Sequence, residues 1–146
     1  MKIEVRLDPE YAEPKLLILA DSMSEEVERI LRLLRSEPGR PLVGFRREGA
    51  SPLEEGGISR IYAQQGRVCA ATDSGEYVLR QRLYELEEKL ASAGFVRISN
   101  SELINLRRVR SFDLNLAGTI RVNLDDGTTA WVSRRYVAKI RKILGM

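Results

Sequence analysis

The chain has 146 residues, 43% of them hydrophobic and 31% charged, which is the composition of a globular protein able to bury its own core. It has no histidine and one cysteine, Cys69, so an internal disulfide is excluded and no metal or cofactor site is expected. The net charge is +3, but residues 1–96 hold 14 Lys/Arg and 17 Asp/Glu whereas residues 97–146 hold 10 and 4, so the basic C-terminal third indicates either a polyanion partner or a solvated Arg-rich surface.

Residues 1–40 predict a small β-β-α unit. Residues 2–7, "KIEVRL", alternate between charged and apolar side chains, as in a half-buried strand. The apolar run at 15–20, "KLLILA", predicts a more fully covered strand. A helix should follow, with Ser22 or Ser24 as its N-cap, and should end at "EPGRP". Asp21 is explained by capping rather than by a phosphoacceptor role, and the unit is a candidate for dimerisation or signal input.

Residues 41–94 have a β-rich pattern that ends in a helix. Residues 42–45, 58–63, 67–72 and 76–80 are candidate strands, and glycine-containing turns join the last three as hairpins. Cys69 lies in one of these strands and is expected to be a small buried hydrophobe. A helix is predicted over 81–94, with an apolar stripe and Gly94 as its C-terminal signal. That stripe consists of Leu83, Leu86 and Leu90.

Residues 95–132 predict a strand at 95–99, a short helical turn within 100–109 and then a three-stranded meander. Its strands are expected at 111–116, 119–124 and 129–133, with turns at "AG" and "DDG". Phe112 and Trp131 are expected in the core because both lie on alternating strands. Asn105 is expected to bond turn backbone.

The last helix should begin after Ser133 and end at Gly145. Its apolar side comprises Tyr136, Val137, Ile140, Ile143 and Leu144, and its opposite side comprises Arg135, Lys139 and Lys142. A docked amphipathic helix with a solvated face accounts for this pattern. A helix of that kind does not require three cations in one row without an acid between them, because pairs of opposite charge would stabilise the helix better.

Two segments in this order resemble the LytTR family of bacterial DNA-binding domains. They are "FVRISNSELINL" at 95–106 and "GTIRVNLDDGTTAWVSRRYVAKIRKIL" at 118–144. The resemblance covers about residues 42 to 146, and Ser99 stands where the family often has histidine. The matching positions are Phe95, Arg97, Ser101, Ile104, Asn105, Gly127, Val132, Ser133, Arg134, Arg135 and Tyr136.

The resemblance implies an α+β fold: a β-rich LytTR-like domain at 41–146 of short antiparallel sheets with flanking helices, preceded by the β-β-α unit. Such domains lack a helix-turn-helix, and their loops enter successive major grooves. It places Asn100 and Arg135 at base-reading positions, because an Asn amide suits adenine and an Arg fork suits guanine. The other DNA-contacting candidates are Ser99, Arg134, Gln65 and Arg67, with Lys139 and Lys142 on phosphates.

The implied function is that of a bacterial, cytoplasmic, non-enzymatic transcription regulator that binds duplex DNA at promoter repeats as a homodimer. A regulatory membrane-protein partner is also implied.

Alternative explanations of these residues and of the function stay open. Asn100 is equally explained as a helix cap, and Arg134 as a brace to a carboxylate. A protein-interaction or ligand-sensing module with an incidental basic face is the second hypothesis. An RNA-binding domain ranks lower because aromatic residues are only 6%, and the missing histidine and phosphate-binding glycine loop rank an enzyme last.

Overall fold

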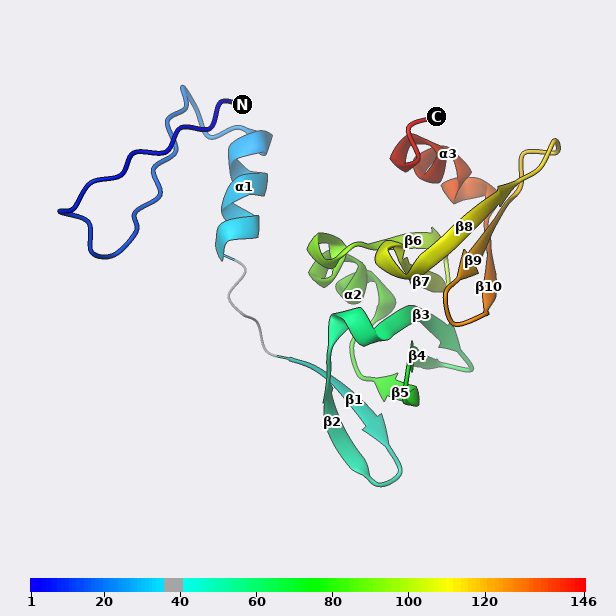
Figure 1. The fold of residues 1–146 in the computed structure, drawn as a ribbon. Coiled ribbons are helices and arrows are strands. Elements are labelled where there is room, and N and C mark those ends of the chain that lie inside the picture. The colour runs from blue at the N-terminus through cyan, green and yellow to red at the C-terminus, as the bar shows by residue number, and fades with distance from the viewer. Residues whose placement is uncertain (36–40) are drawn as a thin grey trace. The chain divides into compact units, whose positions relative to one another are not determined.

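A computed structural model describes residues 1–35 and 41–146 (Figure 1). The chain divides into two compact units, Met1–Gly39 and Arg40–Met146, and each is described by itself. Within the described residues, no helix combines the length and the apolar character that a membrane crossing requires.

The described part of the N-terminal unit, residues 1–35, contains one helix, α1 (Glu25–Arg35). Ser24 is its N-cap, because the Ser24 hydroxyl accepts a hydrogen bond from the Val27 N–H at 3.3 Å. The expected helix is confirmed, but the expected strands at 2–7 and 15–20 are wrong for this single chain, since residues 1–24 form no strand ladder. A strand needs a partner for its backbone groups, and none of residues 1–34 is buried.

The second unit is built on a seven-stranded antiparallel sheet of order β2-β1-β5-β4-β3-β7-β6 (Figure 1). Turns closed by Gly66 and Gly75, both with positive φ, join β3 to β4 and β4 to β5, as the sequence predicted. The strands are β1 (Leu42–Arg46), β2 (Gly49–Leu53), β3 (Ile58–Gln64), β4 (Arg67–Thr72), β5 (Gly75–Leu79), β6 (Phe95–Ser99) and β7 (Glu102–Asn105).

Helix α2 (Leu83–Lys89) packs on this sheet against β3, β6 and β7. Its predicted stripe is buried: Leu86 and Leu90 are fully inaccessible and Leu83 nearly so. The helix leads into a 3-10 turn, η2 (Ala91–Ala93), and Gly94 stops the turn with φ 93°. The leucine stripe of α2 and the facing side chains of the sheet form one hydrophobic core. Its sheet members and neighbours are Leu42, Ile58, Ile61, Ala70, Leu79, Phe95 and Leu103.

A second core lies between the first sheet, a three-stranded sheet and helix α3 (Arg134–Ile143). The smaller sheet has the order β10-β9-β8, from β8 (Val109–Leu114), β9 (Ile120–Leu124) and β10 (Thr129–Val132), as the predicted meander required. On β7, Leu103 belongs to the first core and Ile104 to the second. Because successive side chains of a strand point to opposite faces, β7 is covered on both faces. The α+β fold class is confirmed.

Three local features differ from the expectations. The helical turn expected within 100–109 is confirmed only as the 3-10 turn η3 (Leu106–Arg108), because residues 102–105 before it form strand β7. Strand β2 was not expected from the sequence. It contains Pro52, and a proline is tolerated there because β2 is an edge strand. Trp131 is 58% exposed because Ala130 and Val132 take the inward positions of β10.

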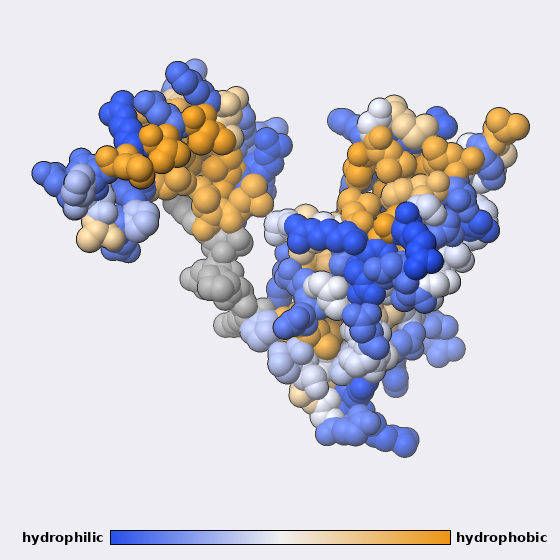
Figure 2. Space-filling model, in the orientation of Figure 1, coloured by the Kyte–Doolittle hydropathy of each residue, from blue (hydrophilic) through white to orange (hydrophobic). Residues whose placement is uncertain are grey.

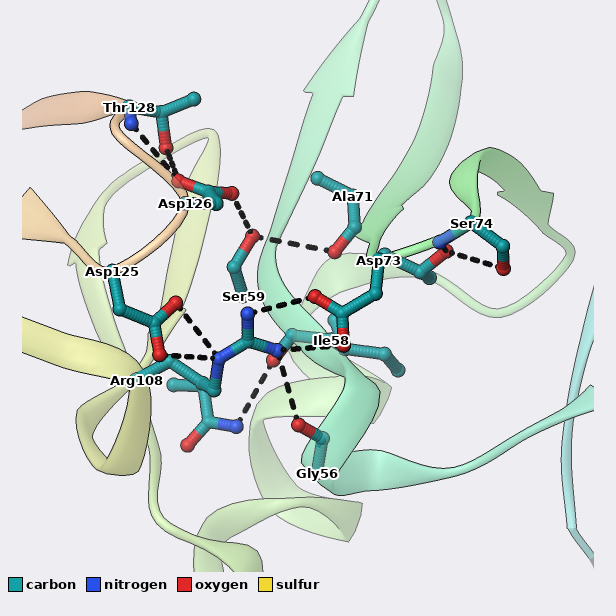
Figure 3. A network of polar contacts seen from close by, with 12 residues as sticks. Gly56, Ile58, Ser59, Ala71, Asp73, Ser74, Arg108, Asp125, Asp126 and Thr128 are labelled. Carbon is teal, nitrogen blue, oxygen red and sulfur yellow. Dashed lines mark hydrogen bonds and ion pairs between the residues drawn. The ribbon is translucent and has the colours of Figure 1, made fainter.

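The two sheets are joined by a polar network at the β9–β10 turn (Figure 3). The Arg108 guanidinium donates from Nε to both carboxylate oxygens of Asp125, from Nη2 to Asp73 at 2.8 Å and from Nη1 to the Gly56 carbonyl. Gly56 lies in a short 3-10 turn, η1 (Glu55–Gly57). These bonds raise the pKa of Arg108 above its ordinary value.

Asp126 makes a second link across the same junction. Its carboxylate accepts from the buried Ser59 hydroxyl at 2.8 Å and from the N–H and hydroxyl of Thr128 (Figure 3). Burial would raise the pKa of Asp126, but the bonds from Thr128 and Ser59 outweigh it and hold the pKa below its usual value. Hydrogen bonds from Arg108 likewise lower the pKa of Asp125.

We expect acid to destabilise this junction. A carboxyl whose pKa is lower in the folded state stabilises the fold above its unfolded pKa, roughly 3.9 for Asp, and loses that contribution as pH falls through the folded value. The free energy of unfolding, from urea titrations at pH 7, 5, 4 and 3, should therefore fall mainly below about pH 4.

Asp126→Asn is the matched variant. It should be less stable than the wild type at pH 7 and lose less on acidification. The Glu102 carboxyl acts in the opposite direction, because burial raises its pKa although Arg60 opposes the change. Equal acid sensitivity in the two proteins would show that Asp126 does not contribute.

Candidate nucleic-acid interface

Three segments far apart in the sequence meet at one end of the large sheet (Figure 1). The Ala63 N–H at the end of β3 donates to the Ser101 carbonyl in the β6–β7 turn at 2.8 Å. The Ser133 N–H, just before α3, donates to the Ile98 carbonyl in β6 at 2.8 Å. The β3–β4 turn, the β6–β7 turn and the start of α3 are therefore neighbours, and they carry the residues proposed from the sequence to contact DNA.

Arg97 holds the β6–β7 turn from inside. Its Nε donates to the Ser99 carbonyl at 2.8 Å and its Nη2 to the Asn100 carbonyl at 2.6 Å. Its Nη1 pairs with the Glu87 carboxylate of α2 at 2.8 Å, and the side chain is only 14% exposed. The β6–β7 pairing is also irregular between Arg97 and Ser99, which turns the following side chains away from the regular sheet.

Ser99 contributes to the same turn. Its hydroxyl accepts from the Ser101 N–H at 3.2 Å and lies 3.3 Å from the Ser101 hydroxyl. Serine hydroxyls stabilise turns in this way. The Ser99 hydroxyl is half-buried and already has partners, so direct contact between Ser99 and DNA stays a prediction.

Asn100 and the start of α3 are linked through Tyr136. The Tyr136 hydroxyl donates to the Asn100 Oδ1 at 3.4 Å, and the Arg135 guanidinium lies 5.9 Å from the centre of the Tyr136 ring. Asn100 and Arg135 are both exposed, whereas Tyr136 is half-buried against the second core. The Asn100 amide and the Arg135 guanidinium are thus both close to one anchored ring, on residues exposed to solvent.

Asn100 does not cap a helix, because the residues after it form β7. Arg134 is exposed, and within residues 41–146 it has no carboxylate within salt-bridge distance, so the alternative of a structural brace is not supported. Ser133 occupies the N-cap position of α3 but makes no side-chain capping bond. Both exposed arginines therefore extend from the helix start without an acidic partner in the part of the chain described.

Lys139 and Lys142 continue along α3, and both are exposed. The Lys139 Nζ lies 3.9 Å from the Glu87 carboxylate, which also binds Arg97. The row of cations expected on this helix thus has one acidic neighbour, Glu87, which another element supplies. A contact of that length between exposed groups is weak, so Lys139 stays available to a phosphate.

The β3–β4 turn presents Gln65 and Arg67. Gln65 has φ 52° and Gly66 has φ 74°, the two consecutive left-handed residues of a tight hairpin turn. Gln65 and Arg67 are both exposed. The turn therefore projects from the same end of the sheet as Asn100, as the prediction required.

Two acids near this surface, Glu87 and Glu102, are each paired with an arginine. Glu102 begins β7, and Arg60 binds its carboxylate at 3.1 Å. Burial raises the pKa of Glu102, with the Arg60 guanidinium acting against it. The exposed charges at the α3 end of the site are consequently cationic, which suits a polyanion.

Sequence reasoning assigned no positioning role to Arg97, Glu87 or Tyr136. Arg97 belonged to the quoted motif, and Tyr136 was assigned to the apolar side of the last helix. Their roles depend on contacts between α2, β6 and α3, which local periodicity does not reveal. The one sequence signal for the role of Arg97 was the "F-x-R" spacing, which places a cation two residues before Ser99.

The family model that describes the LytTr DNA-binding domain matches residues 53–145 of the chain. The chain belongs to the LytTR family. The family match spans both sheets from β3 onward, α2 and α3, and so contains all eight residues proposed to contact DNA. Helices α2 and α3 of this LytTR domain are separated by strands β6 to β10, so the two do not form a helix-turn-helix.

Relatives and a solved structure agree with this placement. Uncharacterized HTH-type transcriptional regulators of Staphylococcus aureus, from strains MSSA476 and NCTC 8325, are 28% identical over 147 residues, which span all of this chain and 99% of theirs. The LytTr DNA-binding domain of a Bacillus cereus response regulator has the same fold, with a TM-score of 0.69 at 20% identity; the match covers 74% of this chain and all of that one.

Proposed function

We propose that the protein is a transcription regulator that binds duplex DNA sequence-specifically from the end of the sheet where the three segments meet. The β6–β7 turn and the start of α3 enter successive major grooves, and the β3–β4 turn approaches the backbone or the adjoining groove. The LytTR family match and the printed names of the full-length relatives support this function. They do not favour the alternative of an interaction or ligand-sensing module.

One observation carries the proposal: Asn100 and Arg135 are exposed neighbours joined through Tyr136. An Asn amide pairs with the N6 and N7 edge of adenine, and an Arg fork pairs with O6 and N7 of guanine. Arg97 bonds to the Asn100 backbone carbonyl and Tyr136 to its amide oxygen, so the turn is held before binding and loses little conformational entropy on binding. In this proposal Lys139, Lys142 and Arg134 contact phosphates, which set the register without reading sequence.

We further propose that the protein acts in the cytoplasm as a homodimer on DNA, with each copy on one of two repeated half-sites. Two copies on one duplex bind more tightly than one, because the second binding event becomes intramolecular. A two-fold protein assembly would match inverted half-sites.

Footprinting and mobility shifts on the DNA upstream of the native gene test this function. We expect one or two protected repeats and an affinity that falls steeply with salt. Weak binding that ignores sequence at physiological salt would contradict the proposal.

Lys142→Ala should weaken binding to every sequence alike, because a phosphate contact carries no base preference. It should also reduce the slope of log K against log salt by about one per half-site. Mobility shifts between 50 and 200 mM salt on a repeat and on a scrambled duplex measure both. Weakening confined to the repeat would show that Lys142 reads a base.

A further inference from the structure

The N-terminal unit carries apolar side chains that nothing in the unit covers. Ile3, Val5 and Leu7 are 79%, 78% and 93% exposed, and Leu17 and Leu19 are 69% and 86% exposed. Figure 2 shows apolar residues gathered on this unit. A unit of this size in which no residue of 1–34 is buried has too little core to be stable alone.

The segment before α1 is apolar on both faces. Its even-numbered residues Leu16, Ile18 and Ala20 line an open groove together with α1 residues that include Val27 and Leu31. The odd-numbered Leu17 and Leu19 do not line that groove. A strand covered on both faces reads as a continuous apolar run, so the composition of this segment suits an inner strand of a larger sheet.

Residues 2–8 have a self-complementary charge pattern. Lys2, Glu4, Arg6 and Asp8 alternate in sign on one side, and Arg6 Nε lies 3.6 Å from Glu4 Oε1, as side chains two apart on one side of an extended segment do. Antiparallel pairing of two copies about Val5 puts each Glu4 opposite the other copy's Arg6, and each Lys2 opposite its Asp8. It also puts Ile3 opposite Leu7.

Neighbouring registers are less favourable. Pairing about Glu4 places Glu4 opposite Glu4 and Lys2 opposite Arg6, and like charges directly opposite each other are destabilising. Pairing about Ile3 leaves Arg6 and Leu7 without partners. Registers shifted by one residue place apolar side chains opposite charged ones.

We infer that two copies of this chain associate through residues 2–8, paired antiparallel about Val5, so that the two N-terminal units form one sheet with shared apolar faces. The inference rests on the proposed function, in which two copies occupy paired half-sites, and it names the surface that joins them. A two-fold axis through Val5 makes the contact isologous and closed, which limits assembly to a dimer. The full-length match to the relatives includes this unit.

Charge reversal tests the register on the full chain, without DNA, by sedimentation velocity over a concentration series. Wild type should be a dimer. Glu4→Arg puts two Arg–Arg pairs into each dimer and should weaken it about tenfold, and Arg6→Glu should do the same. The double variant Glu4→Arg with Arg6→Glu restores opposite charges and should recover most of the loss.

Glu13→Arg is the matched control, because it makes the same charge change at an exposed position of the same unit outside the paired segment, and it should leave the dimer intact. A monomeric wild type, equal effects of Glu4→Arg and Glu13→Arg, or no recovery in the double variant would each overturn the inference. A monomer would show that the apolar face is covered within the chain or by a different partner.

Cysteine cross-linking locates the two-fold axis independently. In a Cys69→Ala background, Val5→Cys places two thiols opposite each other, within the 4.4–6.8 Å between Cα atoms that a disulfide spans, and mild oxidation should cross-link most of the protein. Ile3→Cys should cross-link poorly, because the two copies of residue 3 lie roughly 13 Å apart along the strands in this register. The reverse result would place the axis at Ile3 and overturn the register about Val5.

These measurements separate the dimer surface from DNA reading. Affinity for a single half-site should be the same for Glu4→Arg and the wild type, since residues 2–8 are not among the residues proposed to contact DNA. A monomeric wild type that still binds a half-site would contradict the surface alone. A dimer that binds no repeat would contradict the proposed function alone.

Discussion

Arg135→Ala is expected to lower discrimination between the operator and a duplex changed at one base pair by about 1–3 kcal/mol, while the fold stays intact. The physical reason is that Arg135 is exposed at the start of α3, has only the Tyr136 ring as a neighbour among the interactions described for residues 41–146, and carries the fork that guanine requires. Competition mobility shifts against single-base variants of the repeat would measure it.

Arg141→Ala is the matched control for this variant. It removes the same side chain from the same helix, also at an exposed position, but six residues further on and therefore on a different side of the helix. We expect Arg141→Ala to leave base preference unchanged. If both variants weaken every duplex equally, Arg135 is a phosphate contact and another residue reads that position.

Asn105→Ala is expected to destabilise the LytTR domain by about 2–3 kcal/mol. The Asn105 side chain is 1% exposed; its Nδ2 donates to the Ile58 carbonyl at 3.0 Å and its Oδ1 accepts from the Arg107 N–H at 3.0 Å. Truncation leaves a buried carbonyl and an N–H without these partners. Urea unfolding should show the loss, with the melting temperature lower by roughly 10 °C.

Asn123→Ala serves as the control for Asn105. Its amide donates to the Ser111 hydroxyl at 2.9 Å in a solvent-exposed contact, where water replaces the lost partner. We expect a change below about 1 kcal/mol. Similar losses from the two variants would mean that burial of the Asn105 amide is not what makes it important. DNA affinity should be retained at temperatures where Asn105→Ala is folded.

Local patterns in the sequence determined much of the LytTR domain. The alternation of Ile120, Val122 and Leu124 predicted β9, and the Leu83, Leu86 and Leu90 stripe predicted α2, because side-chain direction repeats every two residues in a strand and every 3.6 in a helix. The two motifs also led to the proposal that Asn100 and Arg135 read bases.

The same reasoning failed where burial depends on a second layer. Residues 102–105 form a strand with both faces covered, so Leu103, Ile104 and Asn105 show no alternation. Trp131 was expected in the core because it lies on an alternating strand, but the register of β10 on β9 gives the inner positions to Ala130 and Val132. The strand expected at 2–7 has a strand pattern but no partner within its own unit.

The sequence by itself determined the family resemblance and most of the elements, and it named the residues proposed to contact DNA. Only the tertiary structure decided that these elements meet: Arg97 binds Glu87 and the turn carbonyls, Tyr136 joins Asn100 to α3, and Ser133 bonds to β6. Periodicity records how a side chain points from its own backbone. The meeting of the elements depends instead on contacts between residues on different elements, such as Tyr136 with Asn100 and Ser133 with Ile98, which local patterns do not report.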